Sequence, residues 1–438
     1  MANYNSYSAW EDQPENLQAS FSGDSKAEVA VIGGGFTGLM AAITLADRGV
    51  DVVLLEQEFC GFGASGRNAG HLTPTIGRDI ANCLKTFGQE KGIRLARFAE
   101  EAVSFTEQVF GTYGIDCDYI QCGNIIAGVH EKQRSSLVKA AAAVSGSGVQ
   151  MRFMDEDEMR QRNLPNAFKF GIQEQSGGLL NPGKYVMALR QVAIDKGIRV
   201  CEQTPVTKLQ PGTKIEVHTS RGRLTADKAL IATNAFTAPN LDRMHRTVVP
   251  MRVTLFNTRP LTDTEMGNVG WQTRQGIYTA HLALENYRLT ADNRISGGSK
   301  WVQYGYGSQL VSGNQPDLFN KFEALLKVRF PELPDLKIET FWGGWIGMTL
   351  DMLPVCGADR HSTNLFHSVG YNGHGIAQAT RLGHVMAHEI LGEPQAEVSL
   401  LKRRLLPIPP EPLRWLGVKA VELAFNGIDK RVDQALDS

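Results

Sequence analysis

The sequence predicts an α/β protein, α+β overall, with a parallel-sheet domain, an interleaved and mainly antiparallel second domain, and a C-terminal helical tail. Three observations predict this fold class. A strand–glycine–helix–strand unit occupies residues 28–56, a second strand–glycine–helix junction occupies 365–390, and short strand-like runs separated by turns fill much of 245–298. The chain has 438 residues, too many for one ordinary core, which favours two domains.

Composition and charge exclude several classes of protein. With 42% hydrophobic and 21% charged residues, the chain resembles an ordinary soluble protein, and its net charge of −1 without a long basic run gives no support for nucleic-acid binding. No apolar run reaches the roughly 18 residues of a spanning helix, and the polar residues 1–25 lack a signal core. The six cysteines are scattered without zinc-site spacing. We therefore expect a cytoplasmic protein with reduced thiols and no metal.

The first structural unit begins with a short β-branched run, Glu-Val-Ala-Val-Ile at residues 28–32, which is typical of a buried parallel strand. A G-x-G-x-x-G pattern follows at Gly33, Gly35 and Gly38. Apolar residues then recur at helical spacing as far as Ala46, and a second apolar strand ends at Glu56.

Each part of this unit has a physical role. Gly33 permits a tight turn, Gly35 lets the backbone approach a pyrophosphate, and Gly38 lets helix and strand pack closely. The helix N-terminus offers free N–H groups to phosphates, and Glu56 can accept hydrogen bonds from a ribose 2′,3′-diol. The alternative is a glycine-rich turn in an unrelated α/β protein. All parts in register predict a Rossmann-like, dinucleotide-binding domain, but do not separate FAD from NAD.

The remaining elements follow in order. A run rich in glycine at 60–71 predicts a loop with special backbone geometry. Helical periodicity marks 79–111, 132–145 and 184–196, and strand-like runs mark 119–129, 200, 206, 215–218 and 228–233. The last strand closes with Asn234-Ala235, where a doubly wound sheet places its next cofactor contact.

The second half of the chain changes character and then returns. Strand-like runs lie at 248–256, 276–283, 286–290 and 294–298, followed by a helix at 316–329, and residues 342–354 lead back toward the first domain. A strand at 365–369, a glycine turn at 370–375 and a helix at 376–390 form the second junction. Two such junctions would place both ends of a long ligand on helix N-termini, which favours FAD over NAD.

These elements define a discontinuous domain organisation. We expect the FAD-binding domain to comprise residues 26–85, 147–240 and 341–400. The substrate domain would comprise residues 86–146 and 241–340, and an amphipathic tail would occupy 401–438.

Together these motifs resemble the D-amino-acid oxidase/glycine oxidase (DAO) family of FAD enzymes over roughly residues 26–395. The run Gly-Ala-Ser-Gly-Arg-Asn-Ala-Gly at 63–70 is similar to the γ-glutamylputrescine oxidase-like branch. The stretches Tyr-Arg-Leu-Thr-Ala-Asp-Asn-Arg-Ile at 287–295 and Gly-His-Gly-Ile at 373–376 are also similar to that branch.

The resemblance implies roles for residues along the cofactor. The glycines of the first motif would hold the pyrophosphate, Glu56 the adenosine ribose, and Val206 would present backbone to the adenine. Backbone N–H groups of 373–376 would stabilise the reduced flavin at its N1/C2=O edge. The expected FAD contacts are Gly33, Gly35, Phe36, Thr37, Gly38, Glu56, Gln57, Gly63, Ala64, Ser65, Gly66, Arg67, Asn68, Ala69, Gly70, His71, Val206, Thr233, Asn234, Ala235, Gly344, Gly373, His374, Gly375 and Ile376.

Three departures from relatives matter. In the glycine oxidases an arginine five residues before the aspartate that matches Asp351 clamps the substrate carboxylate, and here that position is Ile346, which argues against simple α-amino acids. The flavin-linking cysteine of the sarcosine oxidases is missing. His71 could form a histidyl–flavin bond, as a nearby histidine does in some relatives, but noncovalent FAD is favoured.

Candidate catalytic residues come from the expected flavin contacts and the second domain. Amine oxidation needs a neutral amine, a C–H bond aimed at flavin N5 and a dry pocket. The candidates for this pocket are Tyr278, His281, Trp345, Asn372 and His374. Packing is the alternative for the aromatic residues, as is a plain strand histidine for His281. Lys300 would assist oxygen reduction, by resemblance to the sarcosine oxidases, or be solvated, and Arg288 could reach a remote substrate carboxylate.

The resemblance and the tail leave four functions open. The leading one is FAD-dependent oxidation of a primary or secondary amine, or of an N-substituted amino acid, with O₂ reduced to H₂O₂. A membrane-associated dehydrogenase feeding quinone, an accessory flavoprotein acting beside a protein partner, and an NAD enzyme are alternatives. The tail helix, with apolar residues from Leu413 to Val432 along one face, would dock on the enzyme or a second subunit, or lie at a membrane interface.

Overall fold

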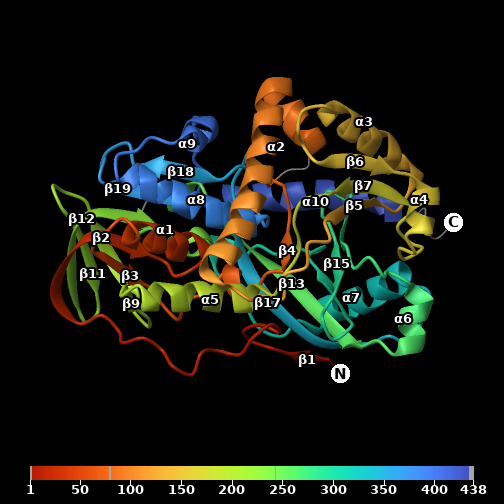
Figure 1. Ribbon diagram of the computed structural model, residues 1–438, viewed down its shortest axis with the longest axis horizontal. Helices are drawn as coiled ribbons and strands as arrows, with labels where there is room; N and C mark the ends of the chain where they lie inside the picture. Colours follow the sequence, from red (N-terminus) through yellow and green to blue (C-terminus); the bar gives the residue numbers. More distant parts are fainter. Residues whose placement is uncertain (1, 78–79, 242, 434–438) are drawn as a thin grey trace.

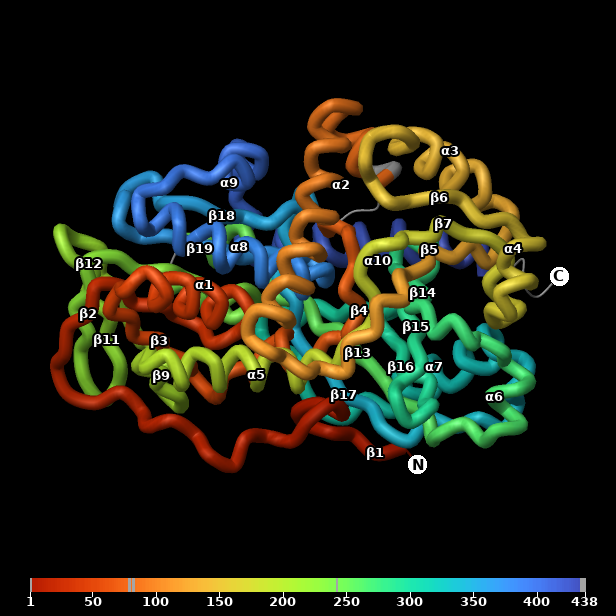
Figure 2. The backbone as a smooth tube through the Cα atoms, viewed as in Figure 1, coloured from red at the N-terminus to blue at the C-terminus, as the bar shows by residue number. Residues whose placement is uncertain are grey.

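The computed structural model describes residues 2–77, 80–241 and 243–433. Two mixed β-sheets lie side by side, and helices pack against both (Figures 1 and 2). The expected mixed α/β fold with a C-terminal helix is confirmed. Within the described residues, no helix is both long and apolar enough to cross a bilayer.

The first sheet has eight strands around a parallel centre. The parallel strands are β9 (Arg199–Cys201), β3 (Val52–Leu55), β2 (Gly23–Ile32), β12 (Gly222–Ile231) and β19 (Leu365–Val369). Antiparallel β10 (Val206–Gln210), β11 (Ile215–Thr219) and β18 (Val355–Ala358) extend it. All residues of β3 and β19 are buried, which explains why β3 is a continuous apolar run rather than an alternating one.

Helices cover one face of this sheet. They are α1 (Phe36–Ala46), α2 (Ile80–Tyr113), α5 (Pro182–Asp195) and α8 (Gly375–Ile390). The long α2 stands upright between the two sheets in Figure 1, and the first residue of the helix expected at 79–111 lies outside the described residues. Asn181 begins α5 by accepting a hydrogen bond from the Lys184 N–H at 3.1 Å, with Pro182 as the first helical residue.

The second sheet has nine strands. Their order is β1 (Asn3–Tyr4), β17 (Ile338–Met348), β13 (Val249–Pro260), β16 (Arg294–Gly298), β15 (Asn286–Leu289), β14 (Gly276–Thr279), β5 (Asn124–Gly128), β7 (Phe170–Glu174) and β6 (Met151–Met154). Alternation sends Ile277, Tyr287 and Leu289 into a core shared with α7 (Pro316–Arg329), while Tyr278 joins the core of the first domain. This second face therefore lies toward the first sheet.

Strand pairing differs from the expected domain ranges at two places. β6 and β7 lie in 147–240, which was assigned to the FAD-binding domain, yet β7 pairs with β5 and β6 pairs with β7 in the second sheet. β17 begins the 341–400 segment but pairs along its length with β13. The local sequence of these strands does not indicate which sheet they join, because their pairing partners lie far away along the chain.

The remaining elements connect these layers. They are β4 (His71–Leu72), β8 (Gly178–Leu179), α3 (Arg134–Val144), α4 (Glu156–Gln161), α6 (Asp263–Val269), α9 (Ala396–Leu401) and α10 (Leu413–Asp433). α10 is the helix expected in the tail, and residues 434–438 of that tail lie outside the described residues.

Candidate active site

A long cavity of about 1360 Å³, including its part open to solvent, lies at the carboxyl ends of the parallel strands. One end is formed by Glu56, Thr204 and Val206, and the other contains His71 and the beginning of α8. The expected cofactor contacts that line it are Gly33, Gly35, Phe36, Thr37, Glu56, Gln57, Gly63, Ala64, Ser65, Asn68, Ala69, Gly70, His71, Val206, Thr233, Asn234, Gly373, Gly375 and Ile376. An elongated ligand would therefore contact both strand–glycine–helix junctions.

A side chain at any of the three glycines of the first motif would lie too close to a neighbouring atom. Gly33 has φ +107°, and a Cβ there would lie 2.8 Å from the Ala232 carbonyl oxygen. A Cβ on Gly35 would lie 2.8 Å from Ser65 Oγ, beside the cavity. A Cβ on Gly38 would lie 1.9 Å from the Gly33 oxygen, so Gly38 serves helix–strand packing and does not line the cavity.

Glu56 stands at the end of β3 and reaches back to the glycine turn. Its carboxylate accepts hydrogen bonds from the backbone N–H groups of Gly34, at 2.6 Å, and Glu58, at 3.0 Å. Burial raises the pKa of Glu56, while these backbone donors oppose that shift. The acid is thus held in place at one end of the cavity before any ligand contacts it.

The loop after β3 is held by its own polar side chains. Ser65 Oγ accepts a hydrogen bond from the Phe36 N–H at 3.0 Å, at the first turn of α1. The Asn68 amide donates to the carbonyls of Ala64 and Ser65, at 3.1 and 2.9 Å, and its oxygen accepts from the Gly70 N–H. These bonds fix the loop against the helix N-terminus.

Arg67 was expected beside the cofactor phosphates, but its guanidinium lies elsewhere. It donates to the backbone oxygens of Phe62 and Tyr7, both at 2.7 Å, and of Gly343 at 3.0 Å. Burial lowers the pKa of Arg67 to about 10. Arg67 therefore joins the N-terminal arm and β17 to the loop, and does not line the cavity. Gly344 packs against its side chain.

Three other expected contacts also support the cavity from behind its lining. Gly66 packs against Tyr7, because a Cβ there would lie 2.3 Å from the tyrosine oxygen. Ala235 is buried in the turn after β12, and His374 is the residue before the first turn of α8. None of the three lines the cavity.

His71 lines the cavity with one ring nitrogen fixed and the other unpartnered. Its Nδ1 lies 3.0 Å from Asn124 Oδ1, and the Asn124 amide nitrogen donates to the Leu72 carbonyl at 3.0 Å. The Asn124 oxygen therefore faces His71 as an acceptor, which assigns the proton to Nδ1 and leaves a lone pair on Nε2. Nε2 is buried and has no hydrogen-bond partner. Burial, and then the charge of Arg288, lower the pKa of His71 to about 3, so the ring is neutral.

The turn before α8 presents backbone to the cavity. Gly373, Gly375 and Ile376 line it. Asn372, a predicted catalytic residue, is instead buried with its amide occupied: its oxygen accepts from the Thr349 N–H at 2.7 Å, and its nitrogen donates to the Gly370 carbonyl at 2.6 Å. Asn372 thus positions the turn against the end of β17.

Trp345 and Ile346 of β17 line the cavity near this turn. The Trp345 indole N–H donates to the Val311 carbonyl at 2.8 Å, and its ring packs edge-on against Phe236 at 5.7 Å. Glu56 and Glu58 are the charged residues among the described residues that line the cavity, and no lysine or arginine does so. An anion there would have to be held by backbone N–H groups and helix N-termini.

Tyr278, another predicted catalytic residue, lies behind the cavity lining. Its hydroxyl is 3.3 Å from Thr75 Oγ1, which also donates to Glu174 Oε1 at 3.0 Å. Glu174 is fully buried, and burial raises its pKa to about 7. The sequence did not indicate this pair, because Glu174 ends β7, Thr75 lies in the loop after β4, and Tyr278 lies on β14.

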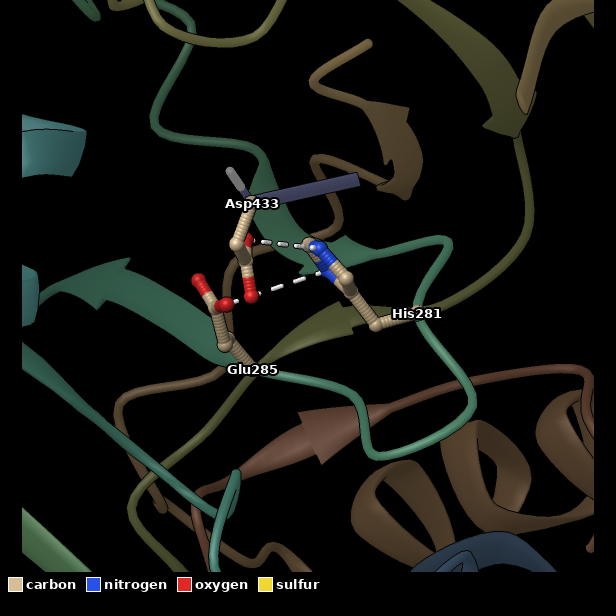
Figure 3. A group of neighbouring side chains, drawn as sticks. All are labelled: His281, Glu285 and Asp433. Carbon is tan, nitrogen blue, oxygen red and sulfur yellow. Dashed lines mark ion pairs between the residues drawn. The ribbon is translucent and has the colours of Figure 1, made fainter. Parts of the chain in front are cut away.

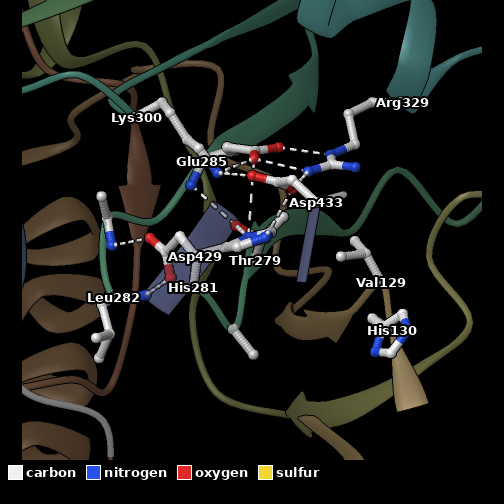
Figure 4. Close-up of polar contacts among 12 residues, drawn as sticks. Val129, His130, Thr279, His281, Leu282, Glu285, Lys300, Arg329, Asp429 and Asp433 are labelled. Carbon is white, nitrogen blue, oxygen red and sulfur yellow. Dashed lines mark hydrogen bonds and ion pairs between the residues drawn. The ribbon is translucent and has the colours of Figure 1, made fainter. Parts of the chain in front are cut away.

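Lys300 and His281 were considered as residues facing the flavin, but they belong to a buried ion cluster (Figures 3 and 4). Lys300 Nζ contacts Glu285 at 2.9 Å and Asp433 at 3.0 Å. Arg329 contacts the same two carboxylates, at 2.7 and 2.9 Å. His281 Nε2 lies 3.2 Å from Asp433. This ion cluster joins α10 to the second sheet and does not line the cavity.

The ion cluster also contains a set of groups with metal-ligand chemistry. Ligand atoms of His281, Glu285 and Asp433 lie within 4.8 Å of one another (Figure 3). However, Lys300 and Arg329 already neutralise the two carboxylates, so a bound cation would face two positive charges. The geometry therefore describes a balanced set of ion pairs.

Arg288 was expected to be able to reach a substrate carboxylate. Its Nη1 donates to the carbonyls of Gly70 at 3.1 Å and Leu180 at 2.5 Å, and its guanidinium lies 5.0 Å from the ring of Trp10. Burial lowers its pKa to about 10. Arg288 holds the loop that carries His71 and does not line the cavity.

Several lining residues were missed by the sequence argument. They are Ile32, Gly34, Leu55, Glu58, Phe62, Thr204, Ala232, Phe236, Leu241, Tyr371 and Ala379. Most flank predicted positions, so extending each motif by one or two residues would have found them. Tyr371 also links the two junctions, because its hydroxyl lies 2.7 Å from Thr37 Oγ1.

The cavity fits an FAD-sized ligand on structural grounds. Glycines leave room beside a helix N-terminus, an acid lies at the strand end where a ribose diol would bind, and a second glycine turn lies at the far end. These are features of this chain's own geometry, independent of relatives.

Comparisons with known proteins agree with this geometry. A sequence model of the family described as "FAD dependent oxidoreductase" (DAO) matches residues 28–389. The γ-glutamylputrescine oxidoreductase of Escherichia coli (strain K12) is 30% identical over 371 residues, covering 84% of this chain and 84% of its own length. The resemblance found in the sequence is therefore confirmed.

Solved structures share the fold. L-proline dehydrogenase from P. horikoshii aligns with a TM-score of 0.72 at 19% identity, covering 85% of this chain and 95% of its own. Glycine oxidase from Geobacillus kaustophilus aligns with a TM-score of 0.71 at 19% identity, covering 87% and 100%. At these identities the likeness supports the arrangement of the two sheets.

Proposed function

The chain belongs to the FAD-dependent oxidoreductase (DAO) family, and we propose that it oxidises the C–N bond of a primary or secondary amine, or of an N-substituted amino acid. Bound FAD would supply the redox chemistry, accepting a hydride at N5 as the C–N bond becomes an imine, with O₂ then reduced to H₂O₂. Gly33, Gly35 and Glu56 would hold its dinucleotide end, and the turn at 373–376 its ring end.

The observation that carries the amine assignment is the lack of a cation among the described residues that line the cavity. An α-amino acid brings a carboxylate next to the reacting carbon, and such a group needs a guanidinium or ammonium partner in a water-poor site. Ile346 occupies the wall where relatives place such an arginine. An amine whose reacting carbon carries no carboxylate is compatible with this apolar wall.

His71 supports the same proposal through the protonation state of the substrate nitrogen. Hydride loss requires the substrate nitrogen in its neutral form. The neutral imidazole, with its proton on Nδ1, keeps this part of the cavity wall uncharged. A cationic residue at this position would instead repel a protonated amine, and the lowered pKa of His71 prevents that charge. We assign His71 this noncovalent role.

The experiment is an anaerobic screen of amines against the FAD-loaded protein, followed by admission of oxygen. The panel would contain monoamines, diamines, N-acylated diamines such as γ-glutamylputrescine, N-methyl amino acids and simple α-amino acids. We expect an amine to bleach the flavin band, and oxygen to restore it with release of peroxide. Bleaching by α-amino acids alone would contradict the proposed substrate class.

The same screen separates the alternatives. Bleaching without rapid reoxidation would indicate a dehydrogenase that passes electrons to quinone, and a flavin that no amine bleaches would favour an accessory flavoprotein. Acid precipitation tests the noncovalent assignment, because noncovalent FAD stays in the supernatant whereas a histidyl-linked flavin remains with the pellet.

A further inference from the structure

α10 packs Trp415, Val418 and Val432 against the protein but presents a larger set of apolar residues outward, unlike an ordinary surface helix. Leu423 is 72% exposed and Leu413 is 61% exposed, although both belong to a helix that rests on the protein. We call the outward residues the apolar face: Leu413, Leu416, Ala420, Val421, Leu423, Ala424, Phe425 and Ile428. Exposed residues between 413 and 428 carry no charge. Exposed apolar surface of this extent marks an interaction site.

Polar contacts hold the helix in this orientation. The buried Asp429 carboxylate accepts hydrogen bonds from the backbone N–H groups of Leu282, at 3.0 Å, and Ala283, at 2.9 Å (Figure 4). Asp433 joins the ion cluster one turn later, and Arg414 donates to Ser308 Oγ at 2.6 Å near the other end. Because fixed partners lie beneath both ends, the helix cannot roll to bury its apolar face against its own sheet.

Exposed charges around the apolar face share one sign. Among residues 402–433, the exposed charged residues are Lys402, Arg404, Lys430 and Arg431. The acids of the same stretch are all buried or half-buried, and each accepts a hydrogen bond: Glu411, Glu422, Asp429 and Asp433. An apolar strip with two exposed cations, Lys430 and Arg431, at its C-terminal end is thus presented outward.

We propose that α10 binds the surface of a bilayer containing anionic lipid, with the apolar face in the headgroup–acyl boundary and the flanking cations on lipid phosphates. Helices that lie in this interface combine these two features. The proposal concerns how the protein docks, and does not depend on which amine it oxidises.

Charge also distinguishes this occupant from a second copy of the chain. A two-fold dimer through the apolar face would leave Lys430 and Arg431 of each copy without an exposed acid on the partner's α10 to pair with them. A bilayer with negative surface potential attracts both cations, each by roughly 1 kcal/mol near the surface, or about fivefold in affinity.

The test is sedimentation of the FAD-loaded protein with phosphatidylcholine vesicles that contain or lack phosphatidylglycerol. We expect binding to the anionic vesicles, weaker binding at high salt, and little binding to phosphatidylcholine alone. Lys430→Gln with Arg431→Gln should weaken the binding roughly twentyfold to thirtyfold. Lys208→Gln, an exposed lysine on β10, is the matched control and should change nothing.

A second pair of variants tests the apolar face. Leu416→Asp with Leu423→Asp should abolish vesicle binding while flavin content and amine turnover in solution stay unchanged. Val138→Asp, a 41% exposed valine on α3, should bind like the parent. Equal binding by parent and Leu416/Leu423 variant would overturn the proposal. So would a parent that ignores vesicles but doubles its mass on concentration, with the doubling lost in the variant, since that outcome assigns the face to a second copy.

Discussion

Ile346 shows how one side chain can set the substrate class. It lines the cavity, and a Cβ built on Gly373 would lie 3.5 Å from its Cδ1, so it adjoins the turn expected at the flavin ring. We predict that Ile346→Arg supplies the missing carboxylate partner and raises kcat/KM for α-amino acids about tenfold to a hundredfold, the worth of a charge-assisted hydrogen bond. Steady-state kinetics on matched amine and amino-acid pairs would measure this.

Ile346→Met is the control, because it keeps the wall apolar and should leave the ratio of the two kcat/KM values unchanged. If Ile346→Arg shifts that ratio no more than the methionine variant does, the assignment of this wall to the reacting carbon is wrong.

Substitutions at Glu56 test the proposed ribose contact at the other end of the cavity. Glu56→Gln removes the charge but keeps the shape, and we expect FAD affinity to fall about tenfold, as for the loss of charged hydrogen bonds. Glu56→Arg should lose most of the FAD, because it also reverses the charge. The ratio of flavin to protein absorbance after dialysis reports both changes. Half-buried Glu216→Gln, on β11 and outside the cavity lining, should retain FAD fully, and equal retention by all three variants would refute the ribose assignment.

Local sequence patterns located part of the cavity lining. Gly33, Gly35 and Glu56 are fixed by short spacings within one strand–helix–strand unit, and all three line the cavity. Lys300 was not predictable in the same way: its partner Asp433 is 133 residues away, so no local pattern shows that the ammonium is already paired. The amide oxygen of Asn372 is likewise already occupied, because it accepts a hydrogen bond from the backbone N–H of Thr349.

At the scale of elements, the ion cluster ties α10 to β14, β15 and α7. Asp433→Asn leaves Lys300 and Arg329 with a single carboxylate, Glu285, in a buried site. Hydrogen bonds and charges from this cluster outweigh burial and hold the pKa of Asp433 below its usual range. Because the Asp433 side chain is 32% exposed, we expect a loss of about 1–3 kcal/mol, less than for a fully buried pair. Urea unfolding measures the loss.

Asp292→Asn is the control for that loss, because Asp292 pairs with Arg294 at the surface, and breaking that pair should cost under about 1 kcal/mol. Flavin content should stay unchanged in both variants, since neither residue lines the cavity. Equal destabilisation by the two variants would show that the cluster contributes no more than a surface ion pair.

α10 also shows which property of an element its sequence can predict. The apolar stripe from Leu413 to Ile428 correctly predicted a helix, but periodicity alone cannot say which side meets the protein. Here the polar partners of Asp429 and Asp433 decide the orientation. Sheet membership has the same character: β6 and β7 read as ordinary strands, and only pairing with β5 places them in the second sheet.

At the scale of the whole molecule, contacts between the two sheets enclose the cavity. Arg67 donates to Gly343 of β17, and the Trp342 indole N–H donates to the Arg67 carbonyl at 2.9 Å. The cavity loop is therefore held between a parallel sheet that supplies the dinucleotide end and a mixed sheet that supplies Trp345 and Ile346. A loss of stability in the first sheet should therefore also destabilise the cavity.

His367 provides a way to measure that stability through pH. It lies on β19, is 5% exposed, and its Nδ1 has no hydrogen-bond partner. Burial lowers its pKa to about 4, although Asp359 opposes the shift. At pH values below about 6.5 the unfolded chain protonates this histidine, whereas the folded protein does not. The free energy of unfolding therefore falls as the pH drops from about 6.5 to 4. This one histidine should cost about 2 kcal/mol at pH 5.

We therefore predict that His367→Gln flattens the decline in unfolding free energy between pH 7 and pH 5 by up to about 2 kcal/mol, whatever the amide substitution costs at pH 7. Urea titrations at several pH values would give the slopes. Exposed His361→Gln is the control and should keep the parent slope. His71, whose pKa is lowered further, acts in the same direction, so the His367 variant should retain part of the decline. Parallel slopes for the parent and the His367 variant would mean that this buried histidine accepts its proton in the folded protein.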